Sequence, residues 1–322
     1  MLKSMNLLFL LKINIFMNSK FSISLIVFIL LETFSLHSQT AEELFRSGFA
    51  KYQNNDFAGA VSDYSQVILM KPDYADAYFN RAIAYEKTRN FKAALADYST
   101  VISLNVSDAN AYLNRGMLYA ETNKPKNALA DFNKALELKP DFSNAYYQRA
   151  MLYRNISQDS LAIKDLFSFL TYHPGSVSGN LALANLYDEM EEYDAAIKIY
   201  SQIIKLEPSH AKAYYNRAYD YDIVAKTTLA IEDYSKAIEL DSTYSDAYFN
   251  RAYAFYEMNE FDKAIEDYSK VIALEPESAD AYINLGIAKI SAGRKSEGCG
   301  CIEKAALLGD KTAKKYYSAN CK

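Results

Sequence analysis

The chain has 322 residues, half of them hydrophobic, and its 35 Lys and Arg against 40 Asp and Glu give a formal net charge of −5. This composition supplies ample apolar material for a core. It offers no surplus of basic residues to neutralise phosphates, so nucleic acid is not an expected partner.

The first 38 residues differ in pattern from the rest of the chain. Lys20 precedes an apolar run from Phe21 to Leu31, and small polar residues follow to Ser38. A basic start, a short apolar run and small residues near a cleavage point are typical of a secretory signal peptide. The alternative is a membrane anchor, but the run is about half of the roughly 20 residues needed to span a bilayer. We therefore expect residues 1–38 to be a signal peptide, with translation starting at Met17, and a protein that is periplasmic or extracellular.

A repeat of 34 residues runs from Ala41 to the C-terminus without a gap. Eight blocks align, starting at Ala41, Ala75, Ala109, Ser143, Val177, Ala211, Ser245 and Ala279. Such a period is typical of a solenoid, in which each unit buries its apolar face against its neighbours. We number positions 1 to 34 within each block.

Each block is predicted to form two helices. Positions 4, 8 and 11, such as Tyr78, Ala82 and Tyr85, lie on one face of a helix. Positions 20, 24 and 27 form the apolar face of a second helix, and a Pro at position 32 ends most blocks. The predicted unit is therefore a helix-turn-helix hairpin.

Positions 7 and 23 vary together. Five blocks have Arg at position 7 and Asp at position 23, which predicts the structural ion pairs Arg81 with Asp97, Arg115 with Asp131, Arg149 with Asp165, Arg217 with Asp233, and Arg251 with Asp267. Block five has Leu183 and Ile199 instead, and block one, with Ser47 and Asp63, is the mismatch. We expect Arg–Asp contacts inside the fold, because a partly buried guanidinium requires a partner. The alternative is a row of Arg residues that holds an anionic ligand.

The 34-residue spacing and its recurring residues resemble the tetratricopeptide repeat (TPR) family. The resemblance implies an all-α helix-turn-helix solenoid that forms a right-handed superhelix. It implies seven full repeats in residues 41–278, and a degenerate eighth repeat with a C-terminal capping helix in residues 279–322.

The resemblance also implies a concave groove, lined by the first helix of each repeat, that binds proteins or peptides without catalysis. By the resemblance its lining would come mainly from positions 2, 5, 9, 12 and 13. The expected groove residues at positions 5 and 9 are Phe45, Phe49, Phe79, Ile83, Leu113, Met117, Tyr147, Met151, Asn185, Tyr215, Tyr219, Phe249 and Tyr253. Tyr and Met are favoured at interaction sites. The alternative is that these side chains pack against the neighbouring hairpin and close the groove.

All three cysteines lie near the C-terminus, and clustered cysteines in an exported chain indicate a disulfide. The resemblance to TPR caps implies the pair Cys299 and Cys321, which leaves Cys301 over. A zinc site is the weaker reading, since no His lies near the three Cys.

No phosphate-binding loop, nucleophile elbow or metalloprotease motif is present in the sequence. We expect no cofactor, no bound metal and no enzymatic activity. The sequence favours an exported scaffold that binds a protein or peptide. The alternative is a glycan- or small-molecule-binding protein that uses Tyr147, Tyr215, Tyr219 and Tyr253.

Overall fold

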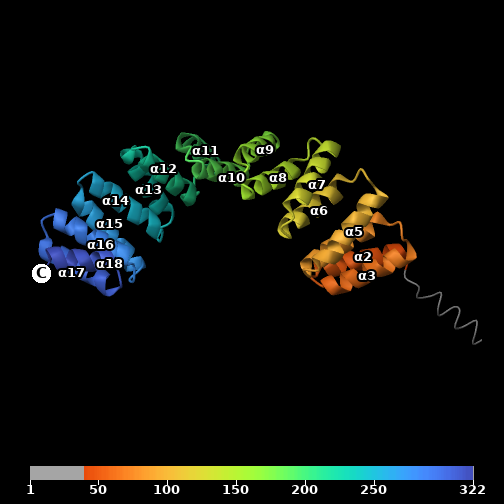
Figure 1. Cartoon of the computed structure of the whole chain (residues 1–322), viewed down its shortest axis with the longest axis horizontal. Helices are drawn as coiled ribbons and strands as arrows, with labels where there is room; N and C mark the ends of the chain where they lie inside the picture. The colour runs from red at the N-terminus through yellow and green to blue at the C-terminus, as the bar shows by residue number, and fades with distance from the viewer. Residues whose placement is uncertain (1–39, 322) are drawn as a thin grey trace, which may run out of the picture. The chain divides into compact units, whose positions relative to one another are not determined.

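The computed structural model describes residues 40–321, which form seventeen helices and no strand (Figure 1). The predicted signal peptide and the start at Met17 lie outside the described residues. None of the described helices is both long and apolar enough to span a membrane.

Sixteen of the helices form eight hairpins, one for each block of the sequence. The first helices are α2 (Ala41–Gln53), α4 (Ala75–Lys87), α6 (Ala109–Glu121), α8 (Ser143–Asn155), α10 (Val177–Glu189), α12 (Ala211–Ile223), α14 (Ser245–Glu257) and α16 (Ala279–Ser291). The second helices are α3 (Phe57–Met70), α5 (Phe91–Leu104), α7 (Pro125–Leu138), α9 (Asp159–Tyr172), α11 (Tyr193–Leu206), α13 (Thr227–Leu240), α15 (Phe261–Leu274) and α17 (Lys295–Leu307). The last helix, α18 (Lys311–Asn320), follows the eighth hairpin.

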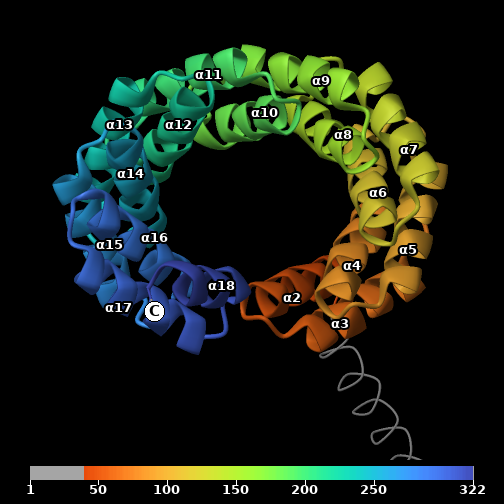
Figure 2. The same cartoon turned by 60° about the vertical axis from the view of Figure 1, so that its left-hand side comes forward.

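The chain divides into two compact units, residues up to Lys139 and residues from Pro140 onwards. Unit 2 forms two layers, with α10, α12, α14 and α16 in one and α11, α13, α15 and α17 in the other (Figure 2). In unit 1, α2, α4 and α6 likewise lie in one layer and α3, α5 and α7 in the other. The first helices of successive repeats are therefore neighbours within each unit.

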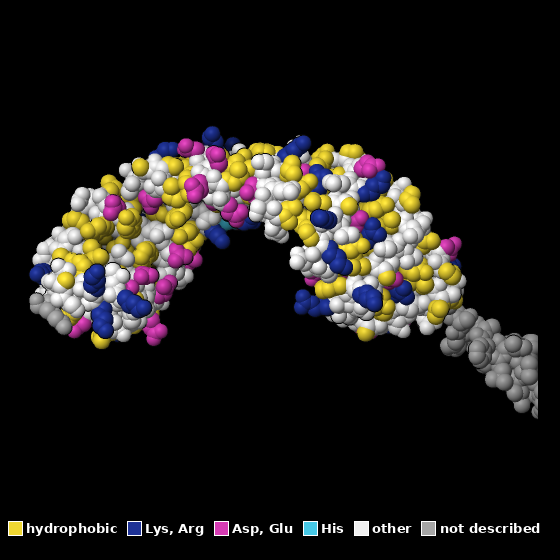
Figure 3. Space-filling model, in the orientation of Figure 1, with side chains coloured by type: hydrophobic (Ala, Val, Ile, Leu, Met, Phe, Trp, Pro, Cys, Tyr) yellow, Lys and Arg dark blue, Asp and Glu magenta, His cyan; other side chains and the backbone are white. Residues whose placement is uncertain are grey.

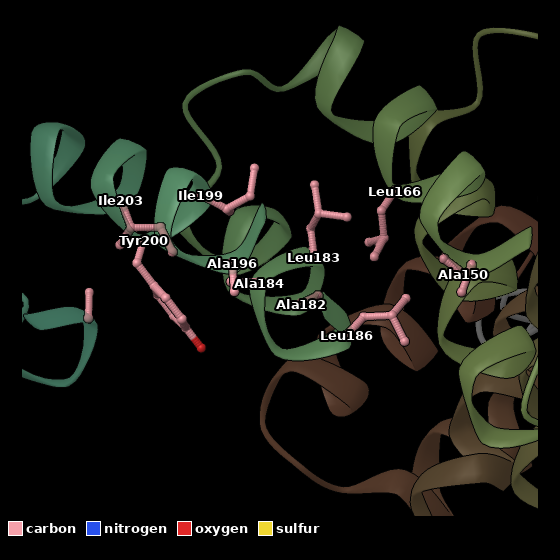
Figure 4. Close-up of a cluster of buried hydrophobic side chains, with 12 residues drawn as sticks. Ala150, Leu166, Ala182, Leu183, Ala184, Leu186, Ala196, Ile199, Tyr200 and Ile203 are labelled. Carbon is pink, nitrogen blue, oxygen red and sulfur yellow. The ribbon is translucent and has the colours of Figure 1, made fainter. Parts of the chain in front are cut away.

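The core of each repeat combines small and large side chains at fixed positions. Ala at positions 8 and 20, such as Ala82 and Ala94, is fully buried and allows the two helices to approach closely. A large side chain at position 24 fills the remaining space between the helices. In five repeats it is a fully buried Tyr, namely Tyr64, Tyr98, Tyr200, Tyr234 and Tyr268. Figure 4 shows the core around repeat five, where Leu183, Leu186 and Tyr200 are all fully buried. Position 24 thus accounts for five of the 28 tyrosines of the chain.

The eighth repeat keeps the same architecture with glycines in place of small side chains. A Cβ atom added to Gly298 would lie 2.5 Å from the backbone oxygen of Gly286, so the two buried glycines allow α16 and α17 to touch through their backbones. Glycine at position 20, where the other repeats have Ala, therefore brings the two helices closer together. Helix α18 covers the end of this repeat, and its Ala313 is buried against Ile302 and Ala305.

The turn between the two helices of every repeat requires a left-handed residue at position 15. This residue has a φ between 55° and 62° in the first seven repeats, at Asn55, Arg89, Asn123, Ser157, Glu191, Ala225 and Asn259, and the eighth has Gly293 with a φ of 82°. A residue with a Cβ pays about 1–2 kcal/mol for this conformation, and glycine pays almost nothing.

Replacing Ala225 by Gly is therefore expected to stabilise the protein by about 1 kcal/mol, and this can be measured by urea unfolding. The matched control is Gly293→Ala, which should destabilise by a similar amount. No atom lies within 4 Å of the added Cβ of Gly293, so only the backbone is strained. Stabilisation by both substitutions would contradict the account.

Candidate functional site

The five Arg–Asp pairs form one repeated structure inside the fold. In each hairpin Arg Nε donates to one carboxylate oxygen at 2.6–2.8 Å and Nη2 donates to the other at 2.8 Å. The Asp residues are 3–7% exposed, and the Arg side chains are 17–18% exposed. This is a bidentate pair in a dry environment, where both ions need each other.

The remaining guanidinium nitrogen connects one repeat to the preceding one. Nη1 of Arg81, for example, donates to Ser65 Oγ at 2.9 Å. The same contact joins Arg115 to Ser99, Arg217 to Ser201, and Arg251 to Ser235. Aromatic rings flank each guanidinium, as Tyr78 and Tyr85 flank Arg81 at 5.5 and 5.8 Å. These Arg residues are fully engaged inside the protein, so the geometry does not favour an anion-binding row.

In the first repeat the buried Asp at position 23 has partners other than Arg. Asp63 accepts hydrogen bonds from Ser47 Oγ at 2.6 Å and from Lys51 Nζ at 2.8 Å. Lys51 occupies position 11, where most repeats have an aromatic residue. The pattern of positions 7 and 23 does not predict Lys51 as the partner of Asp63. A Lys at position 11, where most repeats have an aromatic residue, does indicate it.

Repeat five interrupts the row of ion pairs. Leu183 and Ile199 are buried where the other repeats have Arg and Asp, and Asn180 replaces the flanking Tyr. Together with Phe167 from repeat four, they line a hollow of about 270 Å³. An apolar pair therefore replaces the ion pair at this point without disturbing the helices.

The predicted groove positions divide into two groups. Side chains at position 5 pack inward, as Phe79 does against Tyr98 at 5.6 Å and Tyr215 against Tyr234 at 5.8 Å between ring centroids. Leu113 is 4% exposed, so its assignment to an open surface is corrected. None of the position 5 residues Phe45, Phe79, Leu113, Tyr147, Tyr215 and Phe249 is exposed. Phe45 and Phe249 also pack on the Tyr at position 24 of their repeats, at 5.5 and 5.4 Å between ring centroids.

The exposed large side chains among the predicted groove residues lie at position 9. Phe49 is 46%, Tyr219 is 50% and Tyr253 is 52% exposed. Ile83, Met117, Met151 and Asn185, at the same position, are half-buried. The first-helix face, which we define as positions 2, 5, 6, 9, 12 and 13 of the first helices within one unit, therefore offers large side chains at selected repeats only.

Side chains link adjacent helices along the first-helix face of unit 2. Asn250 Nδ2 donates to the Tyr215 hydroxyl at 3.1 Å, and the hydroxyls of Tyr256 and Ser291 are 3.3 Å apart. Arg154 pairs with Glu189 across α8 and α10 through a hydrogen bond of 2.9 Å from Nε. These bridges place positions 5, 6, 12 and 13 of neighbouring helices side by side.

A buried acidic pair at repeats five and six was not predicted from the sequence. Asp220 is 1% exposed and is hydrogen-bonded to Asp188, and burial next to that carboxyl raises the pKa of Asp220 to about 8. Burial also raises the pKa of Asp188, which accepts a hydrogen bond from the Tyr200 hydroxyl at 2.5 Å. Because burial raises both pKa values and two neighbouring carboxylates repel each other, the pair holds a proton, which the pKa of about 8 assigns to Asp220. The signal was available, since Asp220 stands at position 10, where every other repeat has Ala or Leu.

The cysteines are arranged as the cap resemblance implied. Cys299 and Cys321 form a disulfide with a Cα–Cα distance of 5.5 Å, which joins α17 to the residue after α18. Cys301 is free and packs against the core of repeats seven and eight. Burial raises the pKa of its thiol, so it is held as a thiol. Among residues 40–321, no group of three or more His, Cys, Asp or Glu is placed to hold a metal ion.

The fold defines an all-α repeat solenoid, and the comparisons identify its family. Models described as "TPR repeat" match residues 48–88, 226–259 and 252–293. Models described as "Tetratricopeptide repeat" match residues 75–106, 109–142, 132–164 and 177–210. The chain belongs to the tetratricopeptide repeat family. No curated protein sequence matches it.

Solved structures show the same fold. A crystal structure of MamA protein is 28% identical, covers 53% of this chain and 94% of its own, and has a TM-score of 0.50. The C-terminal part of a TPR repeat-containing protein from Cytophaga hutchinsonii is 21% identical, covers 75% of this chain and 99% of its own, and has a TM-score of 0.68. A tetratricopeptide repeat protein from Parabacteroides merdae is 22% identical with a TM-score of 0.53, and covers 77% of this chain and 98% of its own.

Proposed function

We propose that this protein is an exported, non-catalytic scaffold that binds a protein or peptide segment on its first-helix face. The observation that carries the proposal is the exposure of Phe49, Tyr219 and Tyr253 at position 9 of first helices. Large exposed aromatic side chains on a rigid surface are typical of interaction sites. TPR proteins commonly bind peptides or proteins, and repeat solenoids use extended surfaces for binding.

Export is supported by two independent features. The N-terminal sequence has the pattern of a signal peptide, and the Cys299–Cys321 disulfide suits an oxidising compartment. The purified protein should therefore begin near Gln39 and carry one disulfide. N-terminal sequencing and an intact mass before and after reduction measure both. A precursor that keeps residues 1–38 and has three free thiols would contradict export.

The binding mechanism is passive. The ion pairs and the buried side chains at position 24 hold the first helices in place, so the surface exists before the partner arrives. Preorganisation of this kind lowers the entropic cost of binding. The partner is another polypeptide rather than nucleic acid, because the chain is acidic overall and offers no basic stripe.

The alternative, binding of a glycan or small molecule, requires four exposed tyrosines with nearby carboxylates. Tyr219 and Tyr253 meet that requirement. Tyr147 packs on Phe169 and Tyr215 packs on Tyr234 and Tyr244, so these two rings are not free to stack on a sugar. A surface with two separate exposed rings suits a polypeptide better.

Site-specific photo-crosslinking tests the proposal. A photoreactive phenylalanine placed at Tyr219 or Tyr253 should capture discrete protein partners in the cell. The matched control places it at Lys270, which is exposed on the second helix α15. Equal capture at position 270, or none at positions 219 and 253, would refute binding on the first-helix face.

A further inference from the structure

The charge of the chain is unevenly distributed between its units. Residues 41–139 contain 12 Lys and Arg and 12 Asp and Glu, whereas residues 140–322 contain 20 and 27, a balance of −7. Figure 3 shows Asp and Glu side chains over the α13–α16 part of unit 2 (Figure 3). The acidic character of the protein therefore belongs to unit 2.

Helix α14 combines this charge with an exposed ring. Asp246, Tyr253 and Glu257 occupy positions 2, 9 and 13, and all three are exposed. They are seven and four residues apart, which places them on one face of the helix over about 16 Å. We call them the α14 stripe. None of the ion pairs found among the described residues involves Asp246 or Glu257, so both carboxylates are available to a ligand.

No other described first helix has this combination. At positions 2, 9 and 13, α12 has Lys212, Tyr219 and Ile223. The corresponding residues of α4 are Asp76, Ile83 and Lys87, which place opposite charges at the two ends. In α2, Glu42 is already paired with Lys71. The α14 stripe is therefore a local feature and not a consequence of the repeat.

We propose that the α14 stripe binds a basic polypeptide segment, with a Lys or Arg at each carboxylate and the chain between them over Tyr253. This rests on the proposed function and names the class of partner. Opposite charges favour the cations at both ends, and the exposed ring provides apolar contact and a cation–π surface. An extended chain spans about 16 Å in five residues, so the two basic residues stand about five positions apart.

The neighbouring helices extend the same surface. Tyr219 of α12 precedes the stripe, and Asp280, exposed at position 2 of α16, follows it. The hydrogen bonds from Asn250 to Tyr215 and between Tyr256 and Ser291 hold α12, α14 and α16 side by side. A segment that leaves the α14 stripe therefore meets a second tyrosine on one side and a further carboxylate on the other.

Fluorescence anisotropy with the full mature chain tests the inference. The probe is a fluorescein-labelled peptide with two Arg residues about five positions apart and a Leu between them, on a Ser-Gly background. Two further peptides of the same length carry Gln or Glu in place of both Arg. The Arg peptide should bind at least about tenfold more tightly than the Gln peptide, and added salt should reduce the difference.

The variants separate site-specific binding from general attraction. Asp246→Asn with Glu257→Gln, and separately Tyr253→Ala, should each weaken Arg-peptide binding about fivefold or more. The control Glu232→Gln with Glu266→Gln removes the same charge from exposed positions on the second helices α13 and α15 and should change binding little. Equal losses in both double variants would overturn the inference.

The three peptides also distinguish this inference from the proposed function. Equal binding of the Gln peptide, lost in Tyr253→Ala, would overturn the preference for basic segments and leave peptide binding on the first-helix face standing. Absence of binding by all three peptides would overturn the basic-segment inference, and the photo-crosslinking experiment then decides the broader proposal separately.

Discussion

Replacing Asp267 by Ala is expected to destabilise repeat seven by about 3–5 kcal/mol. The substitution removes the two carboxylate oxygens to which Arg251 Nε and Nη2 donate at 2.7 and 2.8 Å, and leaves only the Ser235 hydroxyl as an acceptor for the guanidinium. Arg251 would remain largely buried between Tyr248 and Phe255, where water cannot replace the carboxylate. Hydrogen exchange of α14 and α15, together with urea unfolding, measures the effect.

The chain supplies the control for this experiment in repeat five. The double variant Arg251→Leu with Asp267→Ile copies Leu183 and Ile199, which are 0% and 8% exposed in their own repeat. It should recover most of the stability lost in Asp267→Ala, because replacing a buried ion pair with apolar residues is often neutral or favourable. A single variant within about 1 kcal/mol of the wild type would show that the pair is not structurally important.

The second large effect is a dependence of stability on pH that arises from Asp220. Its pKa is about 8 in the folded protein against the ordinary value of 3.8. Between these values the folded state holds a proton that the unfolded state has released. The free energy of unfolding therefore falls as pH rises from about 4 to about 8, and this contribution is constant above that window. Each unit of pKa difference between the folded and unfolded states corresponds to about 1.4 kcal/mol. The free energy of unfolding therefore decreases by several kcal/mol across this pH range.

Asp220→Asn should remove this pH dependence. The amide keeps a donor for Asp188, and it cannot ionise. The variant should be more stable than the wild type at pH 8 and similar to it at pH 4, as measured by hydrogen exchange of α12 at several pH values. Asp222→Asn is the comparison, because burial raises the pKa of Asp222 to about 6, so its window is narrower. An unchanged pH profile in Asp220→Asn would contradict a protonated Asp220.

The sequence predicts the origin of the first effect and only part of the origin of the second. The ion pairs could be predicted because positions 7 and 23 change together between repeats. Asp220 could have been noticed as an acid at a position of Ala and Leu, but its partner could not. Asp188 lies on the preceding first helix, 32 residues away, and only the packing of α10 beside α12 brings the two carboxyls together.

The groove residues show the same limit. The family pattern marked positions 5 and 9 as one lining, and the structure separates them. Phe79 and Tyr215 turn toward the Tyr at position 24, and Tyr219 and Tyr253 remain exposed. Exposure depends on how far one first helix covers the next, which a linear pattern does not contain. The α14 stripe likewise depends on the exposure of Tyr253, which is set by the packing of its neighbours.

The sequence by itself determined the helical hairpin, its 34-residue period and the ion pairs of five repeats, because these depend on spacing along the chain. It also marked the family. Only the tertiary structure decided that Lys51 satisfies Asp63, that Asp220 meets Asp188, and which aromatic side chains of the first helices remain exposed. Those outcomes depend on distances between side chains whose positions are set when one helix packs on another, and that packing is a property of the whole fold.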